Sequence, residues 1–514
     1  MIAANLLGKE GIRTLVIERD KNLYSRARAV TVNDWTLRIF QDMGIAEKVK
    51  LDMDDIEHVN WKTHDGKTVL KIGVHDPELS QPPSMSIYQP RMEADLRSVG
   101  TGLESLDIRY GHTFAGLSQD ETGVTLDLLD DEGRPYQARA GYVVGADGGQ
   151  SRVRETLGIS MVGDTRPRRW IVIDGEVLNW WKDCNTLNLW CDAKRPMVDI
   201  PLAKGNHRWE IPLQEGERDD DFAEEDAVWA LLQPLGIDET HVRIKGWAFY
   251  SHHVRHAPHW RQGRVILVGD AAHLMPPWVG QGMQSGIRDG ANVAWKLALL
   301  ARDLVDDSIL DTVQTERWPH VEKMTKMAAT LGNVVESSET LQLLVRDRVL
   351  PLVSKIPDMP KRIAKNLGTD TYRFSNGWVT GKTGRQSAVG KMLPQPMVYD
   401  RHATNQRLDD VFGYGFTIYG LDQDPRREMT TGQRQAWEEL GARFVTVLAP
   451  DASPGDGEIV IDHTGRLRRW MQQHSARVVA VRPDHFVAAT DASGLDVPGI
   501  ALSRGATIAK EARR

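Results

Sequence analysis

Cysteine is nearly absent from this sequence of 514 residues, which has only Cys184 and Cys191. Two cysteines cannot build a disulfide framework, so we expect both to be free thiols without a role. Long apolar runs are absent too, since none approaches the ~20 residues that a helix needs to cross a bilayer. The first residues also lack the basic and apolar regions of a signal peptide. We therefore expect a protein of the cytoplasm that enters no membrane.

A basic excess is also missing. The formal net charge is −7, whereas a general nucleic-acid binder carries more basic than acidic residues. With 41% apolar and 26% charged residues, the composition is that of a globular protein and excludes collagen-like, coiled-coil and disordered chains. The sequence has neither a Gly-x-Ser-x-Gly elbow nor a metal-ligand cluster, so we expect no serine nucleophile and no metal centre. At this length, about two to four domains are expected.

The first residues present predict part of a nucleotide-binding unit. Residues 1–7 have the apolar pattern of a helix, residues 12–17 form an apolar run typical of a parallel strand, and Glu18 follows directly. Helix, strand and acidic residue form the second half of a βαβ dinucleotide unit, whose first half is a strand and a G-x-G-x-x-G turn. We expect a short segment that carries them to precede Met1. The alternative is a helix–strand pair unrelated to nucleotides.

Two more strands end in an acidic residue. Residues 142–146 lead into Asp147 and a glycine turn, and residues 264–269 lead into Asp270, a loop and an amphipathic helix. Turn glycines let N–H groups approach phosphate, and carboxylates accept hydrogen bonds from sugar hydroxyls. With Glu18, these junctions predict a long dinucleotide along the carboxyl edge of one sheet. The roughly 115 residues between the last two junctions alternate in polarity and are rich in tryptophan, which predicts an inserted sheet.

The remainder of the chain predicts a separate module. Residues after Leu304 have helical patterns to about Leu367, and residues 377–396 form a linker rich in glycine and proline. Strands are expected at residues 444–448, 458–461 and 478–481, with Trp437 on a helix between. We expect a small α/β module without cysteine.

Five motifs resemble the class A flavoprotein aromatic hydroxylases, and most closely their 3-(3-hydroxyphenyl)propionate hydroxylase branch. They are RARA at 26–29, YQPRME at 88–93, GADGGQSRVR at 145–154, GDAAHLMPPWVGQG at 269–282 and its continuation MQSGIRDGAN at 283–292. The resemblance covers essentially the whole chain, although the glycine fingerprint of the family is not among the 514 residues.

The resemblance implies an α/β fold of three parts. A three-layer, Rossmann-like FAD-binding domain holds an inserted mixed β-sheet substrate domain, and a redox-inactive, thioredoxin-like domain follows at the C-terminus. The expected boundaries are 1–165 and 255–340 for the FAD-binding domain, 166–254 with part of 60–88 for the substrate domain, 341–376 for a helical segment, 377–396 for a linker and 397–514 for the thioredoxin-like domain. That last domain is expected either to form the contact of a homodimer or to pack against the rest of the chain.

The resemblance also implies which residues hold FAD. Glu18 is expected on the adenosine ribose and Arg28, with Arg26, at the pyrophosphate. Gln89 is expected at the ribityl chain or the flavin, and Asp270 at a ribityl hydroxyl. For Arg26 and Arg28, solvated surface charges are the alternative.

Two further motifs complete the expected site. Asp147 and Arg154 belong to a motif that serves both FAD and NAD(P)H in this family. Pro277 is expected beside the reacting edge of the flavin, and the helix start Gly280-Gln281-Gly282 is expected to stabilise anionic reduced flavin through its N–H groups and dipole.

Other candidates keep two interpretations. Tyr250 or His253, on an expected strand with His252, would remove the phenol proton, or would be ordinary hydrogen-bonded residues. His273 is expected to satisfy backbone groups of its turn, and Gly290 to permit close helix packing. The tryptophans, ten of 16 between Trp170 and Trp295, form sheet core or line an aromatic pocket.

The implied reaction is hydroxylation of a phenol, ortho to its hydroxyl group, by NAD(P)H and O₂ through a C4a-hydroperoxyflavin. The expected substrate is a single ring that bears an acid side chain, such as 3-(3-hydroxyphenyl)propionate. A flavin-dependent halogenase is an alternative, because residues 209–212 (WEIP) match part of a Trp-x-Trp-x-Ile-Pro segment, although His207 stands where its first tryptophan would be. A flavin-free binding or scaffold protein is the third possibility.

Overall fold

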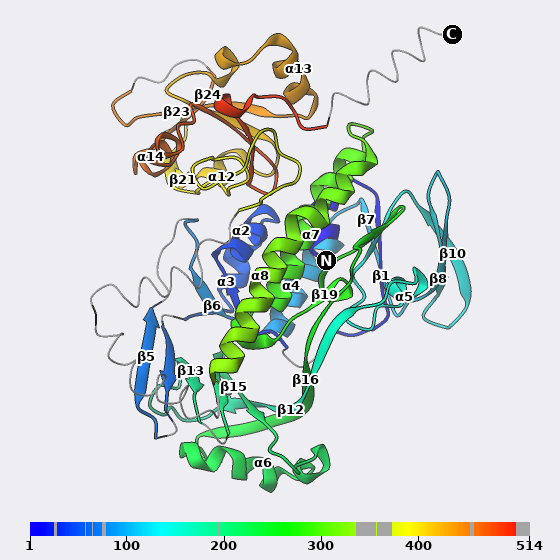
Figure 1. The fold of residues 1–514 in the computed structure, drawn as a ribbon, viewed down its shortest axis with the longest axis vertical. Coiled ribbons are helices and arrows are strands. Elements are labelled where there is room, and N and C mark those ends of the chain that lie inside the picture. Colours follow the sequence, from blue (N-terminus) through cyan, green and yellow to red (C-terminus); the bar gives the residue numbers. More distant parts are fainter. Residues whose placement is uncertain are drawn as a thin grey trace.

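Figure 1 shows the computed structural model, with the C-terminal module (residues 397–499, yellow to red) above a larger part that contains the N-terminus. The structure describes residues 1–24, 28–56, 58–63, 65–73, 79–192, 195–335, 356, 373–452 and 457–499. Its helices outside the C-terminal module are α1 Ile2–Lys9, α2 Asp34–Asp42, α3 Ala46–Lys50, α4 Gln89–Thr101, α5 Arg152–Thr156, α6 Glu225–Leu232, α7 Gly282–Ala301 and α8 Asp311–Val335.

The expected helix near the N-terminus is confirmed, and so are the expected strands and junctions there and around residues 145 and 267. These strands, however, lie in two sheets and not in the expected single sheet. β1 (Thr14–Glu18) pairs in parallel with β7 (Leu106–Tyr110), whereas β11 (Val143–Gly145) pairs in parallel with β18 (Val265–Leu267) in a second sheet. Among the described residues, no strand joins the two sheets. The strand expected before Met1 stays a prediction.

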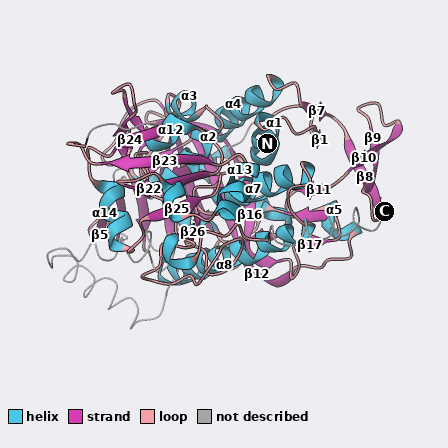
Figure 2. Ribbon diagram, turned by 90° about the horizontal axis from the view of Figure 1, so that it is seen from above, coloured by secondary structure: helices cyan, strands magenta, loops and turns pink. Residues whose placement is uncertain are grey.

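Helices α1 and α7 pack closely against one another. A Cβ atom at Gly290 would lie 3.2 Å from Cβ of Ile2, so the expectation that Gly290 permits close helix packing is confirmed. The smaller strands are β2 Thr31–Asn33, β3 Asp54–Asp55 and β6 Ser84–Ser86 in one sheet, β17 Arg261–Gln262 beside β18, and the meander of β8 Thr113–Gln119, β9 Val124–Leu129 and β10 Pro135–Ala140. Figure 2 shows this meander at the end of the molecule opposite the C-terminal module.

The tryptophan-rich region forms an eight-stranded sheet, as expected, in the order β19-β16-β12-β15-β14-β13-β4-β5. Its strands are β4 His58–Lys62, β5 Thr68–Gly73, β12 Val162–Val177, β13 Leu187–Trp190, β14 Met197–Leu202, β15 Asn206–Pro212, β16 Val242–His256 and β19 His273–Leu274. The antiparallel pair β12 and β16 runs from this sheet up to the nucleotide-binding part (Figure 1). Its register shifts between Thr165 and Arg169 and again between Asp174 and Gly175.

The face of this sheet that packs on α6 is apolar. Ile173 and Trp209 are fully buried there, together with Val228 of α6. The register of β12 and β15 pairs Ile173 with Trp209, so both side chains lie on the same face. One part of the tryptophan cluster is therefore sheet core.

The C-terminal module contains a seven-stranded mixed sheet in the order β21-β20-β24-β23-β22-β25-β26. Its strands are β20 Met397–Tyr399, β21 Asn405–Arg407, β22 Thr417–Leu421, β23 Arg443–Leu448, β24 Glu458–Ile461, β25 Val478–Val481 and β26 Val487–Thr490, and its helices are α12 Leu408–Phe412, α13 Thr431–Glu439 and α14 Arg466–Gln473. The three expected strands and the helix that carries Trp437 are confirmed. They could be predicted because the residues of each have the local pattern of a strand or a helix.

Two expected segments between the parts differ in outcome. Residues 377–396 form no helix or strand, but Trp378, Val389 and Leu393 are buried, so this segment is packed rather than a free linker. The expected helical segment 341–376 falls almost entirely outside the described residues. Cys184 and Cys191 are both buried, and neither forms a disulfide bond. In the part of the chain that the structure describes, no helix has the length and apolarity to cross a bilayer.

Ile173→Ala should destabilise the protein, because it opens a cavity between the sheet and α6. Such truncations of buried isoleucine cost about 2–5 kcal/mol. The loss is measured as a lower midpoint of urea unfolding, followed by tryptophan fluorescence. Val162→Ala is the matched control on the same strand, since Val162 is 52% exposed and its loss should change the free energy of unfolding by at most about 0.5 kcal/mol. Equal shifts for both variants would contradict the assignment of the core.

Candidate active site

One cavity of about 2150 Å³ connects the nucleotide-binding part with the eight-stranded sheet. Pockets for single small ligands usually measure roughly 300–1,000 Å³, so this cavity has room for a large cofactor and a substrate together. It is lined by Glu18 of β1, residues 28–34, the start of α4, parts of the segment 268–284, and the inner face of the eight-stranded sheet. Of the expected site residues, it brings together Glu18, Arg28, Gln89, Asp270, Pro277, Gly280, Gln281 and Gly282.

Gln89 fixes the chain segment that carries Arg28. Its Oε1 accepts hydrogen bonds from the backbone N–H groups of Arg28 (2.8 Å) and Ala29 (2.7 Å), while its Nε2 donates to Glu93 (2.6 Å). The guanidinium of Arg28 lies 4.6 Å from the ring centre of Tyr24 and is open to the cavity. Gln89 therefore fixes the backbone around Arg28, and its expected contact with the ribityl chain or the flavin stays a prediction. Arg26 lies outside the described residues.

Asp289 of α7 holds the loop that follows β18. Its carboxylate accepts hydrogen bonds from the N–H of Gly269 (3.0 Å), from Nε2 of His273 (2.7 Å) and from Nε of Arg317 (2.8 Å). Burial opposes the ionisation of Asp289, but its interactions with His273 and Arg317 outweigh burial and hold its pKa at about 2. His273 is thus structural, as expected, although its partner is a side chain rather than a backbone group.

Asp270 presents a carboxylate to the cavity. It lies in the short turn Gly269–Ala271, and among the described residues its side chain has no hydrogen-bond donor. Its side chain is open to the cavity, although the surrounding protein excludes enough water to raise the pKa of Asp270, against the effects of His273 and Arg28. A carboxylate placed in this way can accept hydrogen bonds from the hydroxyl groups of a sugar-like chain, such as the ribityl chain of FAD.

The start of α7 presents a positive helix end to the same cavity. Gly280 has φ +60°, and a Cβ atom there would lie 2.8 Å from Oγ1 of Thr31, so only glycine fits. Gln281 is the N-cap residue, and the first N–H groups of the helix have no partner within it. Pro277 opens the short turn before this helix and lines the cavity. This arrangement suits an anionic or polar ring edge.

Asp147 and Arg154 do not line the cavity. The Asp147 carboxylate accepts hydrogen bonds from Oγ of Ser151 and from the N–H of Val153 (3.0 Å) at the start of α5. Arg154 is buried and donates from Nη1 to the carbonyl of Ala271 (3.2 Å). Both residues support the turns beside the cavity, and their expected contacts with nucleotides stay predictions.

A polar chain of three residues lies at the sheet end of the cavity. Glu210 of β15 and His252 of β16 line the cavity, and Tyr250 lies between them. The Tyr250 hydroxyl donates to Oε2 of Glu210 (2.8 Å), and Nε2 of His252 lies 3.4 Å from that hydroxyl. Burial raises the pKa of Glu210, against the effects of Arg208 and Tyr250, and burial lowers the pKa of His252 to about 4. His252 is therefore neutral at pH 7.

His253 lies on the other face of β16, because successive side chains of a strand alternate. Its Nδ1 bonds to Oγ1 of Thr165 (2.9 Å), and it does not line the cavity. Its placement does not favour a role at the substrate, whereas Tyr250 and His252 share the inner face. The two-residue spacing between Tyr250 and His252 is the sequence signal that could have identified His252.

Aromatic rings form the wall around His252. Trp170 stacks on it at 5.0 Å, and Trp278 meets Trp170 edge to face at 5.1 Å. The neighbouring strands add apolar side chains to the same cavity, namely Trp61, Leu187, Leu189, Val198 and Ile200. Such a wall suits a flat apolar ring, so the second part of the tryptophan cluster does line a pocket. Trp209, which prompted the halogenase alternative, lies instead in the sheet core.

Arg208 was not predicted from the sequence and ties the two sides of the cavity together. It is the register partner of Asp174 across β12 and β15, and its guanidinium makes two bonds to that carboxylate, at 2.7 and 2.9 Å. Its Nη1 also donates to the carbonyl of Arg28 (3.0 Å). Within the described residues, no group of three acidic, histidine or cysteine side chains is placed to hold a metal ion.

Known proteins resemble the chain over almost its whole length. Residues 1–328 match the family described as FAD binding domain, and residues 390–498 match the HcaD C-terminal domain. The 3-(3-hydroxy-phenyl)propionate/3-hydroxycinnamic acid hydroxylase of Burkholderia cenocepacia is 34% identical over 502 residues, which cover 96% of this chain and 92% of that protein. The enzyme of the same name from Escherichia coli is 32% identical and covers 95% of this chain and 89% of its own length.

Solved structures share the fold. The flavin-dependent monooxygenase PieE, in complex with FAD and substrate, matches with a TM-score of 0.78 at 24% identity over 97% of this chain and 96% of its own. Aklavinone-11 hydroxylase, with FAD and aklavinone, matches with a TM-score of 0.77 at 23% identity over 96% of this chain and 94% of its own. The chain therefore belongs to the FAD-binding-domain family, among the flavoprotein aromatic hydroxylases. It is an FAD-dependent monooxygenase with the mixed α/β fold of that family, as the resemblance implied.

Asp289→Asn should destabilise the protein by about 3–5 kcal/mol at pH 7, the usual cost of removing one side of a buried ion pair. Because the folded pKa of about 2 lies below the ordinary 3.8, the carboxylate contributes its full stability above pH 3.8 and loses it as the pH falls toward 2. The difference in unfolding midpoint between variant and parent should shrink over that range.

Asp311→Asn is the matched control for Asp289→Asn. Asp311 pairs with Arg261 at 2.9 Å, but its side chain is 65% exposed, and surface ion pairs contribute at most about 1 kcal/mol. A loss for Asp289→Asn no larger than that of the control would show that its carboxylate does not hold the loop.

Proposed function

We propose that this chain hydroxylates a phenol with an acidic side chain, such as 3-(3-hydroxyphenyl)propionate, ortho to the phenolic hydroxyl group, with NAD(P)H and O₂. The observation that carries the proposal is the single cavity that leads from Asp270 and the start of α7 to the ring-lined end with Glu210 and His252. The names of relatives at 31–34% identity support the substrate class. Bound FAD would supply the transfer of electrons from NAD(P)H to O₂.

In this proposal, different cavity residues contact different parts of the cofactor. Glu18 holds the adenosine ribose, and Arg28 lies at the pyrophosphate, where Arg26 of the same motif is also expected. Asp270 accepts from the ribityl chain. The N–H groups of Gln281 and Gly282 face the electron-rich end of the flavin, with Pro277 beside its reacting edge, whereas the N–H of Gly280 donates to the carbonyl of Pro277 (2.8 Å). Gln89, Asp147 and Arg154 act by fixing the segments that carry these groups.

Glu210, Tyr250 and His252 would take the phenol proton. Neutral His252 donates from Nε2 to the hydroxyl of Tyr250, so its Nδ1 remains to accept from the phenol; among the described residues Nδ1 has no hydrogen-bond partner. As the phenol proton reaches Nδ1, the Nε2 proton passes to Tyr250 and the Tyr250 proton to Oε2 of Glu210. The balance is one phenolate and one protonated Glu210. Burial, which raises the pKa of Glu210, makes it a better final acceptor.

Trp170, Trp278 and Pro277 would hold the ring and exclude water from the reacting edge. Water has to be excluded because it would cause the activated oxygen to be lost before the ring is hydroxylated. The phenolate is the more electron-rich form of the ring, so removal of the proton favours the transfer.

The division into domains is also proposed. Residues 1–165 and 255–340 would bind FAD, residues 166–254 with part of 60–88 would bind the substrate, and residues 397–514 would form the thioredoxin-like domain. The pairing of β4 and β5 with the strands of residues 187–256 supports the second of these. O₂ as co-substrate is part of the proposed reaction, while a homodimer and a location in the cytoplasm stay predictions.

Purified protein loaded with FAD should oxidise NADH or NADPH faster when 3-(3-hydroxyphenyl)propionate is present, and should form a catechol in proportion to the O₂ consumed. The panel should include the 2- and 4-hydroxy isomers, 3-hydroxycinnamate and the side-chain amide, with product identification by mass spectrometry. Stimulation by none of these phenols would contradict the proposed substrate class.

His252→Gln should lower kcat at pH 7 by about 10²–10⁴-fold, the usual contribution of a general base. The loss should diminish as the pH rises toward about 10, because a phenol ionises there without help. Glu210→Gln should shift the pH profile in the same direction. His253→Gln is the matched control on the opposite face of β16 and should change kcat only a few-fold. A large loss for His253→Gln but not for His252→Gln would reverse the assignment.

A further inference from the structure

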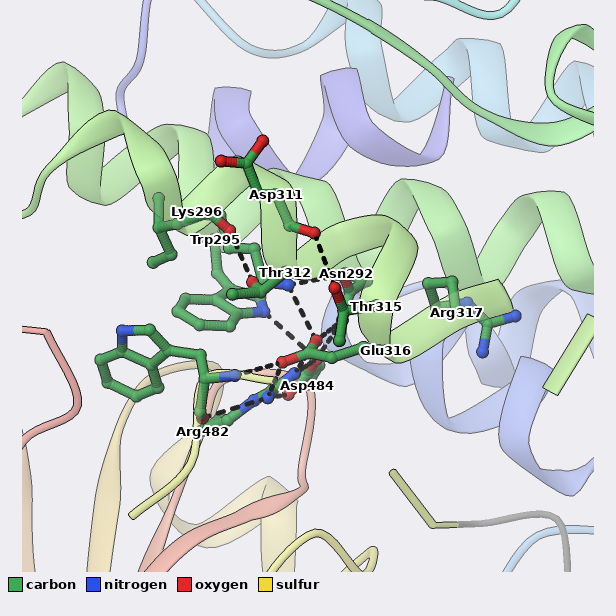
Figure 3. A network of polar contacts seen from close by, with 12 residues as sticks. Asn292, Trp295, Lys296, Asp311, Thr312, Thr315, Glu316, Arg317, Arg482 and Asp484 are labelled. Atoms are coloured by element: carbon green, nitrogen blue, oxygen red, sulfur yellow. Dashed lines mark hydrogen bonds and ion pairs between the residues drawn. The ribbon is translucent and has the colours of Figure 1, made fainter. Parts of the chain in front are cut away.

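The turn between β25 and β26 in the C-terminal module inserts a buried ionic network between α7 and α8. Figure 3 shows Arg482 and Asp484 of this turn beside Glu316 of α8 and Asn292 of α7. The guanidinium of Arg482 makes two bonds to Glu316, at 2.6 and 2.9 Å, and Asp484 accepts from Nδ2 of Asn292 at 3.1 Å. Lys296 joins the network through Glu316 at 2.8 Å.

The charges of this network balance one another and are shielded from water. The side chains of Arg482, Glu316 and Lys296 are 0% exposed, and two basic residues balance two acidic ones. Burial lowers the pKa of Lys296 to about 8, although Glu316 opposes this. A charged group left without its partner here would be strongly destabilising, so the turn has one well-defined position against α7 and α8.

From this position, the turn reaches the cavity through Trp35 of α2. The ring of Phe486, the last residue of the turn, lies 5.5 Å from the ring of Trp35. The guanidinium of Arg288 lies 4.3 Å from the centre of the same tryptophan. Arg288 in turn lines the cavity and donates from Nη1 to Oε1 of Gln281 at 2.8 Å, at the start of α7.

A second contact holds α2 against the module independently. Arg38 lies one helical turn after Trp35, and its guanidinium makes two bonds to Asp409, at 2.6 and 3.0 Å. Its Nη1 also donates to the carbonyl of Leu393 at 2.6 Å. Asp42, at the end of α2, bonds to Nε2 of His485 at 2.9 Å. The helix that carries Trp35 is therefore attached to the module along its length.

We propose that the C-terminal module positions Arg288 for the flavin: the turn at residues 482–486 holds Trp35, and Trp35 holds the Arg288 guanidinium beside Gln281. The proposal rests on the placement of the flavin at the start of α7 given above. Arg288 is thereby a fixed positive charge at the end of the cavity where reduced flavin carries its negative charge. The module acts on the flavin without lining its site, which gives a function to a domain that has no cysteine.

Phe486→Ala removes the ring that holds Trp35, and Phe486→Leu removes the ring but keeps apolar volume in the core. Phe412→Ala is the matched control, because Phe412 is a buried aromatic residue of the same module that belongs to a different hydrophobic cluster from Phe486 and Trp35. Each variant is titrated with FAD, and the midpoint potential of its bound flavin is measured without substrate. Thermal unfolding reports the loss of stability that all three share.

Both Phe486 variants should weaken FAD binding about tenfold and lower the flavin midpoint potential, since the anionic reduced form loses more than the oxidised form. A tenfold larger loss for the reduced form corresponds to about 30 mV for a two-electron couple. Phe412→Ala should leave both values at those of the parent protein. Equal values for the Phe486 variants and Phe412→Ala, at equal loss of stability, would overturn the proposal.

A double-mutant cycle shows whether the effect passes through Arg288. Arg288→Met should lower the potential by itself, and Phe486→Leu should then add nothing, because coupled residues are non-additive. Additive shifts would overturn the route through Arg288. No change in potential for Arg288→Met would instead contradict the placement of the flavin. Hydroxylation of phenols is not used in these measurements, so failure of the proposed substrate class is seen separately.

Discussion

The carboxylate of Asp289 is the constraint on which the cavity depends. It is a fully buried charge that satisfies three donors from two separate stretches of chain, Gly269 and His273 in the loop after β18 and Arg317 in α8. Because Asp289 belongs to α7, the same rigid helix fixes the loop with Asp270 and points its own positive end at the cavity. One turn further along, α7 meets the ionic network of the C-terminal module. A single helix therefore relates the cofactor loop, the cavity and the module.

Much of the fold was predictable from local chemistry. Strands such as Glu458–Ile461 and Val478–Val481 are runs of β-branched residues between turn signals, and their observed bounds equal the expected ones. The junctions at Glu18 and Asp270 were also recognisable, because a strand that ends in an acidic residue and a glycine turn is a local pattern. Eight of the expected site residues meet in one cavity for the same reason.

The features that could not be predicted from the sequence depend on contacts between distant residues. The choice between His252 and His253 is a choice of strand face, and a shift of one residue reverses it; the bulges in β12 cannot be read from the sequence. The pairs Arg208–Asp174 and Arg482–Glu316 join residues 34 and 166 positions apart, and nothing local marks them. The placement of β1 and β11 in two different sheets likewise depends on which strand each of them pairs with.

The long pair of β12 and β16 has a consequence for how the enzyme accommodates its ligands. Two hydrogen-bonded strands resist stretching, but they bend where their pairing is interrupted. The pairing loses register between Thr165 and Arg169, between the cofactor loop and the ring-lined wall. The ring-lined wall would thus rotate as a unit about this register shift to admit larger or smaller aromatic compounds. Its strands would move together and keep their spacing.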